Sequence, residues 1–156
     1  MAISNSHIKA VSSMLCIDMK NGTIDHQFVD RTGVVLAIAL SEDKKRIATG
    51  CSKGKVIIYD CDNFTSPQQI AHKFDTIDSL SFCSDDRFLA VGDGGYIYSD
   101  GRVSLVDVSN GDVSHLKTFR KDTPSCYAND PKNHKLYFGT YYSLAMMIDL
   151  TVLKAK

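Results

Sequence analysis

An internal repeat is the feature of this sequence that most constrains its fold. A short apolar run ends in aspartate four times along the 156 residues, and successive aspartates are 42, 47 and 42 residues apart. A glycine that closes another short run recurs with the same spacings of 42 and 47 residues. Because both markers carry the longer interval, one insertion in the loop 93–100 accounts for it. The repeated residues are Asp18, Asp60, Asp107 and Asp149, together with Gly50, Gly92 and Gly139.

The period of the repeat predicts the fold class. A period of about 40–45 residues is typical of the blades of a β-propeller, each of which is a four-stranded antiparallel sheet. Short runs of β-branched, aromatic and aliphatic residues are bounded by Gly, Asn, Asp and Ser, without a long stretch of helical periodicity. We therefore predict an all-β chain in which residues 1–156 form a single partial β-propeller of about three and a half four-stranded antiparallel blades. The four units are about 1–30, 31–73, 74–120 and 121–156.

The two middle units each contain four strand patterns, whereas the two terminal units are incomplete. The first unit lacks an inner strand, and only six residues follow the last strand pattern, too few for a full outer strand. The expected strands are 1–5, 12–18 and 23–28 in the first unit, 34–40, 46–51, 55–60 and 68–73 in the second, 77–83, 88–93, 102–108 and 112–119 in the third, and 125–129, 135–140 and 144–150 in the fourth.

The repeated dipeptides at the aspartates resemble those of the WD-repeat family, in which the third strand of each blade ends in Trp-Asp. The resemblance covers nearly the whole chain, although the chain contains no tryptophan. The family often joins an Asp, in the turn between the second and third strands, to a His before the first strand. Here the matching turn is Ser52-Lys53-Gly54, so we expect this network to be broken or replaced. The matching pairs are Ile17-Asp18, Tyr59-Asp60, Val106-Asp107 and Ile148-Asp149.

The resemblance implies a divergent propeller that acts as a non-catalytic scaffold and binds other proteins or peptides in a larger complex. A propeller ring closes by pairing its two ends, and an open one exposes strand edges and the apolar flanks of its terminal blades. Three arrangements remain open for this chain. It is a piece of a longer protein with further blades, it closes a ring with its own copy, or its four units form a compact ring.

Composition and charge argue against several classes of protein. The 18 basic and 18 acidic residues give a net charge of zero, and the longest basic run is Lys44-Lys45-Arg46, so a nucleic-acid partner is not expected. No apolar stretch is long enough to span a bilayer, and we expect no membrane insertion. Five cysteines without C-x-x-C spacing favour reduced thiols. With no targeting segment recognised at the N-terminus, we predict a cytoplasmic or nuclear protein.

Catalytic, metal and cofactor motifs are not found in the sequence. The repeated aspartates are expected about one blade apart, whereas paired carboxylate chemistry needs two groups around one substrate. The five histidines show no metal-ligand spacing, and Cys126 is the one thiol that we would test for reactivity. We predict no catalytic residue, no metal and no cofactor. Two rival functions stay open: a propeller-type hydrolase with an axial metal site, and a nucleic-acid-associated propeller subunit.

One face of the expected propeller is the candidate binding surface. The turns between second and third strands and the connections between blades lie on this face. Exposed tyrosine rings there provide a large contact area with a polar group, which is typical of binding hot spots. The alternative is that some of these rings pack between blades. The candidate partner-binding residues are Tyr96, Tyr98, Tyr141, Tyr142, Lys53, Arg31, Asp75 and Lys121.

Overall fold

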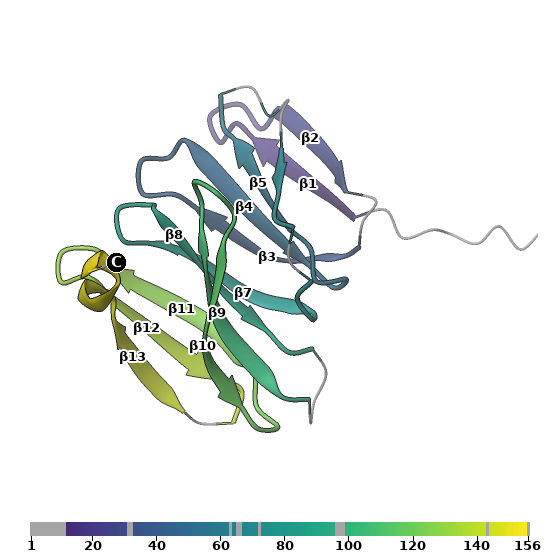
Figure 1. Ribbon diagram of the computed structural model, residues 1–156. Coiled ribbons are helices and arrows are strands. Elements are labelled where there is room, and N and C mark those ends of the chain that lie inside the picture. Colours follow the sequence, from purple (N-terminus) through teal and green to yellow (C-terminus); the bar gives the residue numbers. More distant parts are fainter. Residues whose placement is uncertain are drawn as a thin grey trace, which may run out of the picture.

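The protein consists of four small antiparallel sheets that follow one another in chain order (Figure 1). This computed structural model describes residues 12–30, 33–62, 64, 67–71, 73–95, 99–142 and 144–155. Within them are thirteen strands and one 3-10 helix. The all-β prediction of partial propeller blades is confirmed.

Each of the two central sheets contains four strands joined consecutively, in the orders β3-β4-β5-β6 and β7-β8-β9-β10. Seven of these eight strands fall within one residue of their expected bounds. The exception is β6, which has two residues rather than the expected six. One more backbone hydrogen bond follows it, from the Ile70 N–H to the Val56 carbonyl at 3.0 Å, and the side chains of Ile70 and Phe74 pack in the core, at 2% and 5% exposure. The bounds are β3 Val35–Leu40, β4 Arg46–Cys51, β5 Val56–Asp60, β6 Gln68–Gln69, β7 Ile77–Cys83, β8 Phe88–Asp93, β9 Gly101–Asp107 and β10 Val113–Phe119.

The two terminal sheets contain fewer strands. The first is the hairpin β1-β2, and the last has the order β11-β12-β13. In place of an outer strand, the last sheet is followed by a 3-10 helix that begins at Leu150, a fully buried residue packed with Leu136. The strand expected at 1–5 lies outside the described residues. The bounds are β1 Ser12–Ile17, β2 Ile24–Asp30, β11 Pro124–Asp130, β12 Lys135–Thr140, β13 Ala145–Asp149 and η1 Leu150–Ala155.

The repeated aspartates make the same local contact in all four sheets. Asp18 follows β1, and the other three aspartates end β5, β9 and β13. In each case the Oδ1 accepts a hydrogen bond from the backbone N–H two residues later. Such a contact stabilises the turn that leaves the strand. The four distances are 2.8 Å from Asp18 to Lys20, 2.8 Å from Asp60 to Asp62, 3.0 Å from Asp107 to Ser109 and 3.0 Å from Asp149 to Thr151.

The repeated glycines Gly50 and Gly92 lie where the first strand of the next sheet packs against their own sheet. A Cβ atom on Gly50 would lie 2.3 Å from Cγ2 of Ile77, the fully buried first residue of β7. A Cβ atom on Gly92 would lie closest to Ser79 Oγ of its own sheet, and 3.0 Å from Cβ of Pro124, the first residue of β11. The glycine therefore leaves the space that the next inner strand fills, and this close approach requires the absence of a side chain.

The inner strands β3, β7 and β11 lie side by side in space, and each begins with a β-bulge. The register shifts between Val35 and Ala37, between Ile77 and Ser79, and between Pro124 and Cys126. A bulge adds one unpaired residue and redirects its side chain. The added residues are Leu36, Asp78 and Ser125, which occupy equivalent positions in the repeat.

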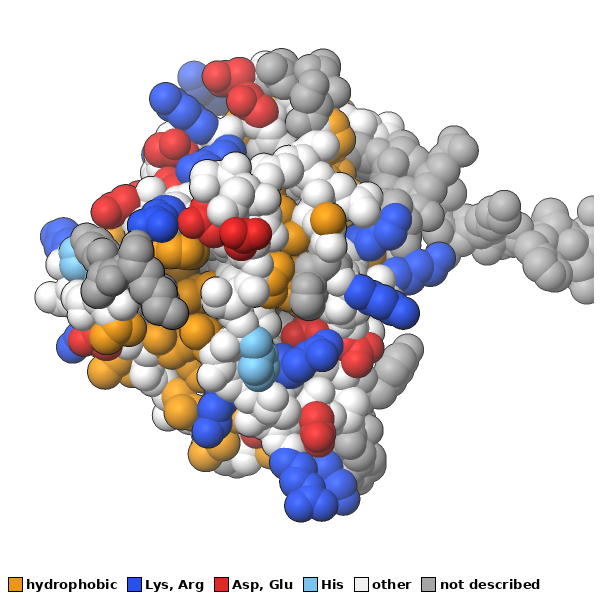
Figure 2. All heavy atoms as spheres, in the orientation of Figure 1, with side chains coloured by type: hydrophobic (Ala, Val, Ile, Leu, Met, Phe, Trp, Pro, Cys, Tyr) orange, Lys and Arg blue, Asp and Glu red, His pale blue; other side chains and the backbone are white. Residues whose placement is uncertain are grey.

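Apolar side chains remain exposed over the last sheet and along the inner strand β3 of the second sheet. Figure 2 shows hydrophobic side chains gathered at the lower left, over the sheet β11–β13. In the second sheet, exposed residues alternate along β3 with the buried Ala37 and Ala39. The exposed apolar residues on or next to β3 are Val34, Leu36, Ile38 and Leu40, and those of the last sheet and its turn include Tyr137, Leu144, Met146 and Met147.

Candidate functional site

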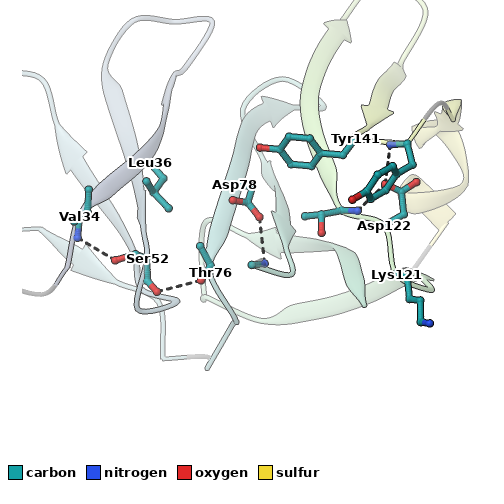
Figure 3. A pocket seen from close by; sticks show the side chains of 11 residues that line it. Val34, Leu36, Ser52, Thr76, Asp78, Lys121, Asp122 and Tyr141 are labelled. Atoms are coloured by element: carbon teal, nitrogen blue, oxygen red, sulfur yellow. Dashed lines mark hydrogen bonds between the residues drawn. The ribbon is translucent and has the colours of Figure 1, made fainter. Parts of the chain in front are cut away.

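Turns and inter-sheet connections meet at one end of the inner strands. Second-to-third-strand turns provide Ser52, Gly95 and Tyr141, and connections that precede inner strands provide Val34 and Thr76. These residues surround a single cavity (Figure 3). The geometry therefore brings together the two kinds of loop that the repeat places on one face.

In each of the three blades that begin with β3, β7 and β11, a polar contact joins the turn to the connection. Each of these contacts uses different groups. In the first contact the acceptor is a hydroxyl on the turn side. In the second it is a carboxylate on the turn side, and in the third it is a carboxylate on the connection. The Asp–His pair of the WD-repeat pattern is absent from these three contacts, and backbone N–H donors replace the histidine. The contacts are Val34 N–H to Ser52 Oγ at 3.1 Å, Asp75 N–H to Asp93 Oδ2 at 2.7 Å, and Tyr142 N–H to Asp122 Oδ1 at 3.1 Å.

Asp93 is the most buried of these carboxylates, with no exposed surface. Its Oδ2 also accepts a hydrogen bond from the Arg102 guanidinium, and the two side chains form an ion pair. This hydrogen bond raises the pKa of Arg102. A buried charge is tolerated when it is paired and hydrogen-bonded, so Asp93 acts as a structural anchor for the loop at Asp75.

The cavity has a volume of about 740 Å³ and mostly apolar walls. It lies between the starts of β3 and β7 on one side and the last sheet on the other (Figure 3). Such a volume lies in the range typical of binding pockets. The lining residues are Val34, Leu36, Ser52, Thr76, Asp78, Gly95, Lys121, Asp122, Thr123, Tyr141 and Tyr142.

Asp78 is a half-buried carboxylate that faces this cavity (Figure 3). Burial raises the pKa of Asp78, and the neighbouring carboxylates Asp93 and Asp75 raise it further. The backbone N–H of Gly95 donates to its Oδ2 at 3.3 Å, which acts in the opposite direction. Among the described residues the ion pairs join Arg87 to Asp107 and Arg102 to Asp93, so Asp78 has no cationic partner there.

The residues predicted from sequence as partner-binding are distributed around the cavity. Tyr141 and Tyr142 line it and are 67% and 51% exposed, and Lys121 lines it as well. Lys53 and Asp75 are exposed on neighbouring loops without lining the cavity. The remaining candidates, Arg31, Tyr96 and Tyr98, lie outside the described residues.

Sequence reasoning missed the two acidic residues of the cavity. Asp78 is the one acidic residue of its inner strand, whose other residues are apolar residues, serines and a cysteine, and that was the available signal. Asp122 is buried, and its Oδ1 also accepts the N–H of Thr123 at 2.9 Å. Nothing in the sequence distinguishes Asp122 from the other loop aspartates, because its burial follows from how the last two sheets pack.

Comparison with protein families assigns the repeat. The family described as "WD domain, G-beta repeat" matches residues 22–60 and 65–107, together just over half of the chain. The chain belongs to the WD-repeat family. The two matched segments end at Asp60 and Asp107, the same repeated aspartates that stabilise the turns after β5 and β9. WD-repeat proteins are generally protein-interaction scaffolds and usually non-catalytic. No curated protein matches the chain.

Other features of this WD-repeat protein bear on its chemistry. In the described part of the chain, no group of three or more His, Cys, Asp or Glu residues is arranged to hold a metal ion. No helix there is both long and apolar enough to cross a membrane. None of the five cysteines, all of which are described, forms a disulfide, and Cys126 is exposed. Burial raises the pKa of the Cys83 thiol to about 12, so this cysteine stays protonated at neutral pH.

Proposed function

We propose that this WD-repeat protein is a non-catalytic interaction module that binds a protein or peptide partner over the cavity at the loop face. The observation that carries the proposal is the convergence of loops from three blades on one cavity, with Tyr141 and Tyr142 exposed at its wall. Tyrosine combines a large apolar surface with a hydroxyl that can donate or accept, which is why it is common at the centre of binding surfaces.

The loops that carry these tyrosines are fixed by hydrogen bonds before any partner binds. The Tyr141 N–H donates to the carbonyl of Thr123 at 3.1 Å, and the Tyr142 N–H donates to Asp122. On the neighbouring connection, the Lys121 N–H donates to Asp100 Oδ1 at 2.9 Å. A surface that is already ordered loses less conformational entropy on binding, so more of the contact free energy contributes to affinity.

Charged residues surround the tyrosines and would form the rim of the interface. Lys53, Asp75 and Lys121 are exposed and carry both signs of charge, and such rim charges tune specificity and association rate more than affinity. Arg31, Tyr96 and Tyr98 belong to the proposed surface by their position in the sequence. Free cysteines fit a reducing compartment, so we place the module in the cytoplasm or nucleus.

Partner capture with paired tyrosine variants tests the proposal. The tagged protein would be incubated with an extract of its own cells, and the retained proteins would be identified by mass spectrometry. Replacing both residues (Tyr141→Ala with Tyr142→Ala) should remove the specific partners. The control, Tyr137→Ala, alters an exposed tyrosine on β12 that does not line the cavity, and should retain them. If the double variant keeps its thermal unfolding temperature and still captures the same partners, the assignment of this face is wrong.

A further inference from the structure

We propose that the cavity binds a cationic side chain, the arginine or lysine of a partner peptide, with Asp78 as its counter-charge. This inference rests on the proposed function, because it assumes that the loop face binds proteins. It adds the chemical class of the residue that enters the cavity, and it follows from the position of Asp78, the surrounding charges and the shape of the walls.

The β-bulge at the start of β7 explains why Asp78 is directed toward the cavity. The added residue of a bulge leaves the ladder, and its side chain is redirected. At the equivalent bulges, β3 has Leu36 and β11 has Ser125. Leu36 also lines the cavity. Of the three blades, only the one formed by β7–β10 therefore provides an ionisable group at this position.

The charges near the cavity favour a cation. Asp75 and Asp93 act electrostatically on Asp78, whereas Arg102 forms an ion pair with Asp93 and also interacts with Asp75. Burial and the two neighbouring carboxylates both disfavour the charged form of Asp78, as its raised pKa shows. A bound cation would remove this unfavourable interaction, whereas a bound anion would increase it. Asp122 adds a second carboxylate to the lining.

The walls suit the shape of a long basic side chain. Figure 3 shows the hydroxyl end of Tyr141 directed toward Asp78 across the cavity, with Val34 and Leu36 beyond Asp78. Apolar walls accommodate the methylene stem of lysine or arginine, and a tyrosine ring attracts the charged group. The one basic residue of the lining, Lys121, is directed away from Asp78 in the same view. It therefore leaves the space beside Asp78 to a basic group of the partner.

A titration with small peptides tests this inference without knowledge of the natural partner. The probe is acetyl-alanyl-arginyl-alanine amide, and the control replaces arginine with citrulline, which is neutral and nearly the same shape. Two-dimensional NMR spectra should show saturable shifts around Leu36, Asp78 and Tyr141 with the arginine peptide. The citrulline peptide should bind about tenfold more weakly or not at all.

Variants of the protein complete the test. Asp78→Asn keeps the acceptor for the Gly95 N–H but removes the charge, and should weaken arginine binding about tenfold. The matched control is Asp62→Asn, which removes an exposed carboxylate that does not line the cavity, and it should bind like the wild type. Retained peaks in the spectrum of each variant show that it is folded.

Three results would overturn the inference: equal binding of the two peptides, unchanged binding by the folded Asp78→Asn variant, or no saturable shift at the cavity. These results are distinguishable from failure of the proposed function. If Asp78→Asn captures the same cellular partners while the double tyrosine variant loses them, the loop face binds proteins but Asp78 does not recognise a cation. If neither variant changes capture, both proposals are wrong.

Discussion

The junction between the two central sheets and the free face of the last sheet start from the same repeated residues but end in different environments. At the junction, Gly50 leaves room for Ile77, which is fully buried. At the free face, a Cβ on Gly139 would meet, among the described residues, Cys126 Sγ of its own sheet at 3.1 Å and the Leu144 carbonyl of the adjoining turn at 3.9 Å. The glycine at this repeated position therefore packs against the next sheet at the junction, whereas its equivalent in the last sheet does not.

The difference separates the contacts that form within one blade from the contacts that need a neighbouring blade. The β11–β12 and β12–β13 pairings and the aspartate turn form in the last sheet, because they depend on contacts within a few residues or between adjacent strands. Burial of the sheet faces is incomplete there, because it needs a second sheet. Most of the hydrophobic free energy of a propeller therefore belongs to the junctions between blades.

The largest expected effect comes from truncating equivalent inner-strand residues at a filled and an open face. Leu80 on β7 is 9% exposed, whereas Ile38, 42 residues earlier on β3, is 55% exposed. Leu80→Ala should lower the free energy of unfolding by about 2–4 kcal/mol, because it removes buried methyl groups and leaves a cavity. Ile38→Ala should cost less than about 1 kcal/mol. Urea unfolding followed by circular dichroism measures both, and equal costs would mean that the β3 face is covered in solution.

A smaller effect is expected at the repeated glycines. Gly50→Ala would place Cβ 2.3 Å from Ile77 Cγ2, and such overpacking should cost about 1–3 kcal/mol. Gly139→Ala meets less obstruction and also restricts the unfolded chain, so the change should stay below about 1 kcal/mol. The same urea measurement compares the two variants. A Gly139→Ala cost as large as that of Gly50→Ala would show that another surface packs on the last sheet.

The smallest effect concerns the aspartate turns, which should behave alike in both regions. Hydrogen bonds from the Ser109 hydroxyl and the Thr151 hydroxyl are the main causes that lower the pKa values of Asp107 and Asp149 below the ordinary 3.8. Because these pKa values are lower in the folded state, both carboxylates stabilise the fold above pH 3.8. This contribution is lost as the pH falls through the folded-state values. An NMR titration of the aspartate carboxyl carbons measures both pKa values. If only one of them were lowered, the two turns would not be equivalent.

Asp78 should show the opposite behaviour in the same titration. Its folded-state pKa is raised above 3.8, so the folded state holds the proton more tightly than the unfolded state. Stability contributed by Asp78 is therefore present below pH 3.8 and is lost as the pH rises through its folded-state pKa. Asp78→Asn should leave stability at neutral pH unchanged or slightly higher, and a clear loss would contradict the assigned environment.

Much of the architecture could be predicted from the sequence, because the signals are local and repeated. Spacing of the aspartates and glycines located the blades, and alternating apolar runs located most strands to within one residue. Residues 68–73 were the clear error, since their strand pattern did not reveal that Ile70 and Phe74 turn into the core. For the site, the repeat placed Tyr141, Tyr142 and Lys121 on a shared face, but it could not show that Asp78 is directed there by a bulge.

The sequence by itself determined the repeating unit of this WD-repeat protein: the strand order within each blade, the turns held by Asp18, Asp60, Asp107 and Asp149, and the small residue at each junction. These features depend on backbone geometry and on contacts between neighbours along the chain. Only the tertiary structure decided which glycine packs against a neighbouring strand, which apolar face stays exposed and which carboxylate faces the cavity. Burial and electrostatic environment depend on groups that lie far apart in sequence and meet only when the blades pack.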